Sequence, residues 1–285
     1  MIEIDFLEEL DRFSFMIRKR VSSVYSGARR SIRQGRGIDI YDFGEYFPGD
    51  DLKAVDWKLY SRTERLYIRR FEEEKSLTTH ILVDASRSMD FGKKFDYAAM
   101  LAAGFAYLVT KENEKFALAT YSEDLRDVMQ PRKGKTHFLN AVELLKGKKL
   151  EGKTRVNFCA ERYGGMIRSR SLVVLISDFL ENLASVQQGI YKLARRNELI
   201  AIQIFDAGEK NLDWLSGDAK VYDMESSEMM RTYISPKLKA EHEERFAEHI
   251  QGIKKACSEV GADFFSIATS TPIFDAFLEF STVLG

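Results

Sequence analysis

The chain has 285 residues and a formal net charge of −1, with 45% hydrophobic and 31% charged residues. This composition is ordinary for a globular protein and excludes an intrinsically disordered chain. The longest apolar run, residues 98–109, is too short to cross a bilayer, and the first residues lack the basic start and apolar core of a signal peptide. The two cysteines, Cys159 and Cys257, predict reduced core thiols and no disulfide framework. We therefore expect a cytoplasmic protein.

The first 76 residues predict a small mixed α/β module. Residues 4–24 have the apolar spacing of a helix, and residues 38–47 look extended. Phe47-Pro48-Gly49-Asp50 places proline and glycine where a type II turn requires them. Residues 66–71 then predict a further strand.

From residue 77 to residue 285, predicted strands and helices alternate. Strands are expected at residues 79–83, 115–121, 172–176, 199–205, 219–222 and 263–267. Helices are expected at residues 95–110, 136–146, 155–166, 183–195, 236–257 and 272–280. This alternation predicts a second, larger domain of the α/β class, with a doubly wound and mainly parallel sheet.

Oxygen-bearing side chains follow two of the predicted strands. Asp84 ends the strand at residues 79–83, with Ser86 and Ser88 in the loop beyond it, and Asp178 follows the strand at residues 172–176. Thr154 lies in a loop between these two strands, just before a predicted helix. In an open parallel sheet, ligands gather beyond the carboxyl ends of the strands, where the strand order reverses. These carboxylates and hydroxyls predict a site for a hard cation such as Mg²⁺.

The pattern Asp-x-Ser-x-Ser, followed by a Thr and then an Asp, resembles the metal-ion-dependent adhesion site of von Willebrand factor type A domains. The resemblance implies that Asp84, Ser86, Ser88, Thr154 and Asp178 hold Mg²⁺, with Mn²⁺ or Ca²⁺ as alternatives. It also implies that an open coordination position accepts a Glu or Asp carboxylate from a partner protein.

Two of these residues also have a plainer interpretation. Asp178 and Glu181 have the spacing of a capping box at the start of the helix that follows. Thr154 could be the N-cap of the helix predicted at residues 155–166.

Residues 42–57, DFGEYFPGDDLKAVDW, resemble the signature of the domain-of-unknown-function family numbered 58. Lys53 is a departure, because arginine is usual there in the family. The resemblance implies a von Willebrand type A domain after the signature and an adaptor role beside a MoxR-type AAA+ ATPase. For Asp50, Asp51, Asp56, Trp57 and Arg62, we expect a structural role: a capped turn packed on the main domain by the tryptophan and a buried ion pair.

Alternative functions come from two other segments. Residues 147–154, GKKLEGKT, match the P-loop pattern, in which Lys153 would bind phosphates while Thr154 and Asp178 bind Mg²⁺. The spacing before Gly147 is helical, whereas a P-loop follows a strand, so an NTPase is the less favoured prediction. Nucleic-acid binding is the second alternative, through an acid-free basic stretch that contains Arg12, Arg18, Lys19, Arg20, Arg29, Arg30, Arg33 and Arg36.

Other enzyme classes find less support. His242 and Glu243 begin like a zinc-protease helix, but the second histidine is missing, and we expect His242 and His249 to be exposed. A phosphatase of the haloacid dehalogenase type would need an aspartate at position 86, where the chain has Ser86. We therefore expect a protein-binding module without catalytic activity.

Overall fold

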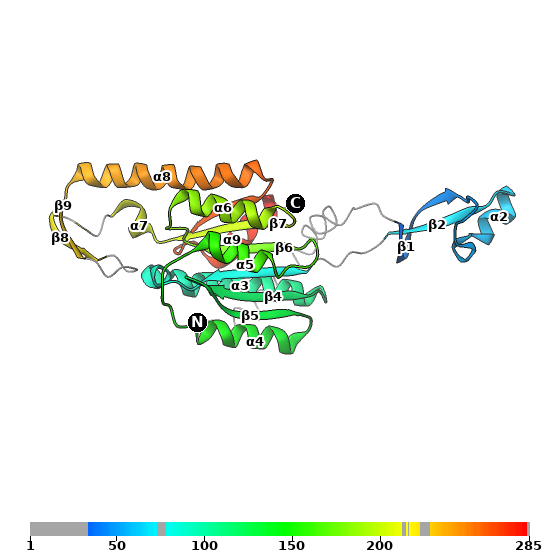
Figure 1. The fold of residues 1–285 in the computed structure, drawn as a ribbon, viewed down its shortest axis with the longest axis horizontal. Helices are drawn as coiled ribbons and strands as arrows, with labels where there is room; N and C mark the ends of the chain where they lie inside the picture. Colours follow the sequence, from blue (N-terminus) through cyan, green and yellow to red (C-terminus); the bar gives the residue numbers. More distant parts are fainter. Residues whose placement is uncertain (1–33, 73–77, 213–214, 216, 223–228, 284–285) are drawn as a thin grey trace. The chain divides into compact units, whose positions relative to one another are not determined.

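The computed structural model describes residues 34–72, 78–212, 215, 217–222 and 229–283. Figure 1 shows the path of the chain, which divides into two units. Described residues 34–72 belong to the first unit, and the described residues from 78 onwards belong to the second. The helix predicted at residues 4–24 lies outside the described residues.

A two-stranded antiparallel sheet organises the first unit. β1 (Gln34–Glu45) pairs with β2 (Tyr67–Glu72), and the chain between them forms the 3-10 helix η1 (Leu52–Ala54) and helix α2 (Trp57–Thr63). The predicted type II turn is present. The Asp50 N–H donates to the Phe47 carbonyl at 3.0 Å, and Gly49 has a φ of +115°.

The second unit is built on a six-stranded sheet in the order β10-β7-β6-β3-β4-β5. Its strands are β3 (Thr79–Asp84), β4 (Phe116–Tyr121), β5 (Leu125–Arg132), β6 (Leu172–Ser177), β7 (Glu198–Phe205) and β10 (Asp263–Ala268). β5 is antiparallel to its neighbour, and the other strands are parallel. The chain runs from β3 outwards to β5 and then returns to place β6 on the other side of β3, so the strand order reverses between β3 and β6.

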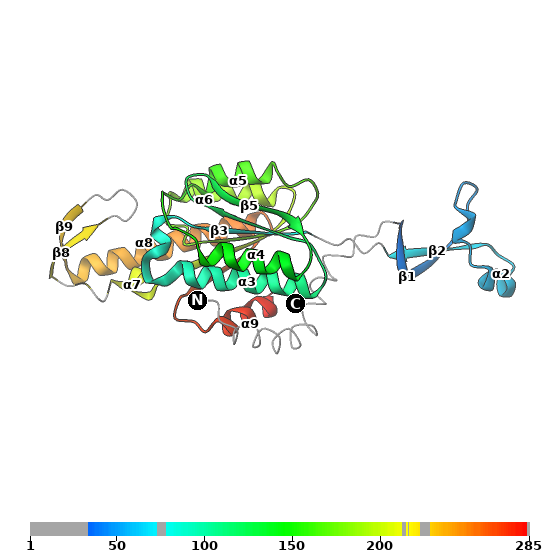
Figure 2. The ribbon, with the colours of Figure 1, turned by 90° about the horizontal axis from the view of Figure 1, so that it is seen from below.

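Helices cover both faces of this sheet, as Figure 2 shows. One face carries α3 (Lys94–Lys111), α4 (Lys135–Lys146) and α9 (Ile273–Val283). The other carries α5 (Val156–Gly164), α6 (Leu183–Ala194) and α8 (Pro236–Glu259). A core cluster joins the sheet to the second group of helices and includes both free, buried cysteines, Cys159 and Cys257. The α/β fold with a mainly parallel, doubly wound sheet is confirmed.

Several elements were not predicted from the sequence, among them η1 and α2 of the first unit. β5 is a half-buried edge strand with a proline, and its mixed pattern is typical of an edge that must not pair with another chain. Helix α7 (Ala207–Asn211) is too short to show a periodicity. β9 (Met229–Ile234) pairs with β8 (Gly217–Tyr222) in a separate two-stranded sheet, so the strand predicted at residues 219–222 exists but lies outside the main sheet.

Within the described residues, we find no helix that combines the length and apolar character needed to cross a membrane.

Candidate metal centre

Two neighbouring strands position the two predicted aspartates at the same edge of the sheet. Asp84 is the last residue of β3, and Asp178 directly follows Ser177, the last residue of β6. The strands are paired in parallel, with Val83 opposite Ile176, so their carboxyl ends coincide. Both aspartates are fully buried. They lie where the strand order reverses, which is the position expected for a ligand site in an open α/β sheet.

The loop after β3 folds its two serines back towards Asp84. The Ser86 N–H donates to Asp84 Oδ1 at 2.9 Å, and the hydroxyl oxygens of Ser86 and Ser88 lie 3.0 Å apart. Beyond Ser86 the chain enters the 3-10 helix η2 (Arg87–Lys93), which leads into α3. Ser86 is fully buried, and Ser88 keeps 9% of its surface exposed.

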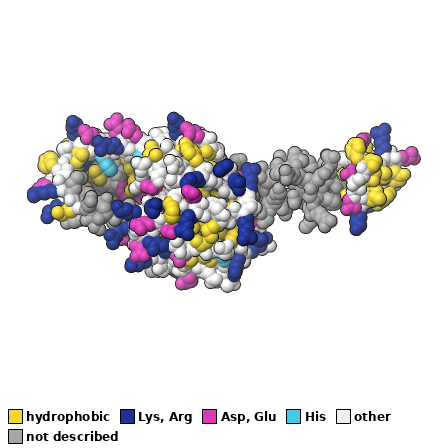
Figure 3. Space-filling model, viewed as in Figure 1, with side chains coloured by type: hydrophobic (Ala, Val, Ile, Leu, Met, Phe, Trp, Pro, Cys, Tyr) yellow, Lys and Arg dark blue, Asp and Glu magenta, His cyan; other side chains and the backbone are white. Residues whose placement is uncertain are grey.

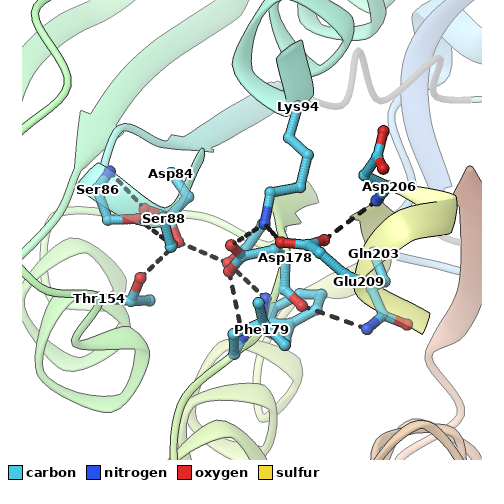
Figure 4. A network of polar contacts seen from close by, with 12 residues as sticks. Asp84, Ser86, Ser88, Lys94, Thr154, Asp178, Phe179, Gln203, Asp206 and Glu209 are labelled. Carbon is cyan, nitrogen blue, oxygen red and sulfur yellow. Dashed lines mark hydrogen bonds and ion pairs between the residues drawn. The ribbon is translucent and has the colours of Figure 1, made fainter. Parts of the chain in front are cut away.

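Thr154 reaches the same cluster from a loop far along the chain. Its hydroxyl donates to Asp84 Oδ2 at 3.2 Å, and its side chain is 5% exposed. The loop is tied to the one after β3 by two backbone hydrogen bonds, from Arg87 N–H to the Gly152 carbonyl and from Glu151 N–H to the Ala85 carbonyl. Figure 4 shows the predicted side chains side by side at this end of the sheet. The structure therefore brings all five together.

The capping interpretations of Thr154 and Asp178 are wrong. Asn182 caps α6, because its side chain accepts a hydrogen bond from the Ala184 N–H at 3.0 Å. Glu181 instead accepts a hydrogen bond from the Val156 N–H at the start of α5. Thr154 and Asp178 both precede these caps. The Thr154 hydroxyl donates to Asp84, whereas Asp178 accepts a hydrogen bond from the Leu180 N–H at 3.2 Å through Oδ1 and contacts Lys94 through Oδ2.

The surroundings of Asp84 disfavour the ionised form of its side chain. Burial and the nearby charge of Asp178 raise the pKa of Asp84 to about 7, although hydrogen bonds from Ser177 and Ser86 lower it in part. Ser177 donates to Asp84 Oδ2 at 2.6 Å. The Tyr121 hydroxyl, fully buried in the same region, makes no hydrogen bond of ordinary geometry. A cation would therefore stabilise the ionised form of Asp84.

The donor set fits a hard divalent cation. It consists of two carboxylates and three hydroxyls, and oxygen donors with room for water are what Mg²⁺ prefers. Each hydroxyl oxygen has two lone pairs, so Ser86 and Ser88 can bind a cation while they are hydrogen-bonded to each other. Across the described part of the chain, no group of three or more His, Cys, Asp or Glu side chains is placed to hold a metal.

A buried lysine beside the site was not predicted. Lys94, the first residue of α3, has a fully buried side chain whose ammonium lies 2.8 Å from Asp178 Oδ2 and 2.5 Å from Glu209 Oε1. Burial lowers the pKa of Lys94, but the charges of Asp178 and Glu209 raise it by more, so Lys94 stays protonated. Nothing in the local sequence distinguishes Lys94 from the exposed Lys93 before it. Its role follows only from the tertiary contacts.

His242 and His249 are not exposed on α8, contrary to expectation. Both are half-buried, and each has its Nε2 near a backbone carbonyl. His242 lies 2.6 Å from the Glu209 carbonyl, and His249 lies 2.8 Å from the carbonyl of Phe179, the residue after Asp178. The charged helix therefore packs against α7 and against the loop that follows β6.

The P-loop pattern lies in the wrong structural context for an NTPase. Gly147 ends helix α4, whereas a P-loop connects a strand to a helix. Thr154 is hydrogen-bonded to Asp84, and the Lys153 N–H donates to the Glu123 side chain at 3.3 Å. Residues 12–33 of the predicted basic stretch lie outside the described residues, and Arg36 lies in β1, so nucleic-acid binding stays a prediction.

A model of a protein family described as "Protein of unknown function DUF58" matches residues 42–252 of this chain. The match covers most of the sequence and begins at the signature identified above. The chain belongs to the DUF58 family. Among the curated proteins, the uncharacterized protein Rv1480 of Mycobacterium tuberculosis is 24% identical over 260 residues, covering 89% of this chain and 81% of Rv1480.

Solved structures with a similar fold share little sequence with this DUF58 chain. The pilus adhesin SpaC of Lactobacillus rhamnosus GG, in its open conformation, gives a TM-score of 0.50 at 9% identity, over 74% of this chain and 30% of SpaC. A von Willebrand factor type A protein of Catenulispora acidiphila gives 0.47 at 13% identity, over 74% of this chain and 43% of that one. At this identity the likeness to SpaC concerns the fold alone.

The DUF58 signature forms the capped turns of the first unit. The side chains of Asp50, Asp51 and Asp56 accept hydrogen bonds from backbone N–H groups close by in the sequence. Arg62 is exposed, so the expected buried ion pair is wrong. Trp57 packs edge-on against Tyr60 and keeps 62% of its surface exposed.

Hydrophobic side chains are exposed over the described part of the first unit, as Figure 3 shows. The large ones are Phe43, Phe47, Leu52, Trp57 and Tyr60.

Proposed function

We propose that this chain is a protein-interaction module without catalytic activity, and that it holds Mg²⁺ through Asp84, Ser86, Ser88, Thr154 and Asp178. Mn²⁺ or Ca²⁺ would use the same oxygen donors. The observation that carries the proposal is the convergence of these five side chains, from three loops, at the reversal of strand order. A bound Mg²⁺ would offer an open coordination position to a Glu or Asp carboxylate of the partner.

The burial of the five residues indicates the direction from which a partner would approach. Asp84, Ser86 and Asp178 are fully buried, whereas Ser88 and Thr154 keep 9% and 5% of their surface exposed. A carboxylate from outside would therefore reach the site over Ser88 and Thr154. Hydrogen bonds from the Ser86 N–H and the Ser177 hydroxyl fix the orientation of the Asp84 carboxylate before any partner binds.

For the partner, we propose a MoxR-type AAA+ ATPase, with this chain as an adaptor in the assembly or activation of other proteins. The support for this partner is the family resemblance of residues 42–57 together with membership of the DUF58 family.

The test is binding of the purified chain to a MoxR-type ATPase from the same source, measured by surface plasmon resonance in Mg²⁺ and in EDTA. We expect EDTA, Ser88→Ala and Thr154→Ala each to weaken binding by about tenfold or more, because EDTA removes the cation and each variant removes one hydroxyl that would hold it. Thr110→Ala is the matched control, since Thr110 is a half-buried threonine whose hydroxyl donates to the Ala106 carbonyl within α3, outside the donor set. Tight binding that is unchanged by EDTA and by both variants would contradict the proposal.

A further inference from the structure

The side of Asp178 that faces away from the serines is occupied by a buried ion pair. Lys94 lies between Asp178 and Glu209, and Figure 4 shows this pair on the opposite side of Asp178 from Ser86, Ser88 and Thr154. The Lys94 side chain has no exposed surface, and that of Glu209 keeps 15%. An ammonium so deeply buried is expensive unless its position serves the site or the fold.

The position of Lys94 is fixed from several directions. Glu209 forms a capping box with Asp206 at the start of α7, in which its Oε2 accepts a hydrogen bond from the Asp206 N–H at 3.1 Å. Helix α8 also holds Glu209 in place, because His242 contacts the Glu209 carbonyl. Lys94 itself starts α3, so its backbone is also held. The ammonium therefore cannot swing away from Asp178 without breaking an organised set of contacts.

An ammonium at hydrogen-bond distance from Asp178 competes with any other cation for the negative charge of that carboxylate. The net charge of the Lys94–Glu209 pair is zero, so its effect is that of a dipole whose positive end faces Asp178. Because Lys94 already offsets part of the negative charge of Asp178, this carboxylate would neutralise a bound divalent cation less completely. More of the cation's positive charge would then be available to a carboxylate of the partner.

We infer that the Lys94–Glu209 pair sets the selectivity of the site: it weakens the binding of the divalent cation and strengthens the binding of a partner's carboxylate to the loaded site. The inference rests on the proposed function and deepens it. Lys94 and Glu209 act through Asp178 and are positioning residues.

Two variants change this dipole in opposite directions. The double variant Lys94→Met with Glu209→Gln removes the dipole, keeps the net charge and preserves the side-chain lengths approximately. We expect it to bind Mg²⁺ about fivefold more tightly and a carboxylate about fivefold more weakly. Glu209→Gln alone leaves the Lys94 ammonium without its outer carboxylate, so we expect weaker Mg²⁺ binding and stronger carboxylate binding.

The control removes an ion pair from the surface. Lys146 and Glu143 lie 3.8 Å apart on α4, and their side chains are 42% and 78% exposed. Lys146→Met with Glu143→Gln makes the same chemical change away from the site, and both affinities should stay as in the wild type.

The experiment uses the full chain. Mg²⁺ affinity is measured by isothermal titration calorimetry, and the carboxylate probe is acetate, followed by the relaxation of its methyl protons on the Mn²⁺-loaded protein. Opposite movement of the two affinities in the double variant, reversed in Glu209→Gln, supports the inference. If the double variant does not fold, Glu209→Gln alone tests the inference, which predicts weaker Mg²⁺ binding and stronger acetate binding in this variant.

Three results overturn the inference. Loss of both affinities together in the variants would make Lys94 a purely structural residue. Unchanged affinities in folded variants would show that the dipole is too weak to matter, while the proposed function would stand. A wild-type chain that binds neither Mg²⁺ nor Mn²⁺ would refute the proposed function, and the inference with it.

Discussion

At the scale of single residues, Asp84 is the group on which the site depends most. Its carboxylate accepts hydrogen bonds from Ser86, Thr154 and Ser177, yet burial and Asp178 make its ionised form unfavourable. Without a cation, this arrangement lowers the stability of the fold, and cation binding restores that stability.

The raised pKa of Asp84 predicts a pH-dependent affinity for Mg²⁺. Asp84 has a pKa of about 7 in the folded chain, so below this pH a proton must leave before a cation can bind. We expect the apparent Mg²⁺ affinity to fall by about tenfold per pH unit from pH 7 to pH 5, and to level off above pH 7. Calorimetry in two buffers of different ionisation enthalpy would detect the proton released on binding at pH 6. An affinity that is flat from pH 5 to pH 8 would contradict the prediction.

All five residues of the candidate donor set were predictable, because each follows a recognisable strand or precedes a recognisable helix. Lys94 and Glu209 were not, since Lys94 is 84 residues from Asp178 and 115 residues from Glu209 in the sequence. A buried lysine has no local signature, and its identity depends on which distant carboxylates the fold brings to it.

At the scale of elements, the approach of α6 to α5 positions one side of the site. The backbone of α6 comes so near at Gly189 that an added Cβ would lie 2.7 Å from Val156 Cγ1 and 3.2 Å from the Val156 carbonyl carbon. Val156 begins α5 two residues after Thr154, so the packing of these helices also places the Thr154 hydroxyl.

Gly189→Ala should therefore weaken both stability and metal binding. Relief of the contact requires α5 to shift, since backbone atoms are involved, and we expect a loss of about 1–3 kcal/mol in the free energy of unfolding. Urea unfolding measures this loss, and Mg²⁺ affinity should fall with it. The control is Gly165→Ala, where the nearest atoms to an added Cβ lie 3.5 Å and 3.6 Å away. A Gly189→Ala variant as stable as Gly165→Ala would show that α5 and α6 yield without cost.

The long central strands and helices of the sheet were predictable from their periodicity, and the elements near its edge were not. β5 mixes apolar residues with charges and a proline because one side of it is exposed, which hides the alternation of a strand. The strand at residues 219–222 has strand-forming residues, but its partner is β9, and local sequence does not specify a partner.

At the scale of the whole molecule, the two units differ in how much core they possess. The second unit buries apolar side chains on both faces of a six-stranded sheet. In the first unit, Val55 and Ile68 are the buried apolar side chains among those whose burial is described. A segment of about 40 residues rarely folds without further support.

A fragment of residues 78–285 should therefore fold by itself, whereas a fragment of residues 34–72 should not. We expect the larger fragment to unfold cooperatively and to keep the Mg²⁺ affinity of the full chain to within about twofold, because the donor set lies in the second unit. Circular dichroism and calorimetry on both fragments test this expectation. An unfolded larger fragment would show that the first 77 residues contribute to the core that supports the site.

The most direct test of the metal centre is thermal unfolding of the full chain with EDTA, with Mg²⁺ and with ATP. At ten times its dissociation constant, Mg²⁺ should stabilise the wild type by about 1.4 kcal/mol, which raises the midpoint by about 2–4 °C. We predict this shift for the wild type and for Thr110→Ala, and its loss in Asp84→Ala, with no effect of ATP. An equal Mg²⁺ shift in Asp84→Ala, or a shift that needs ATP and disappears in Lys153→Ala, would contradict the account.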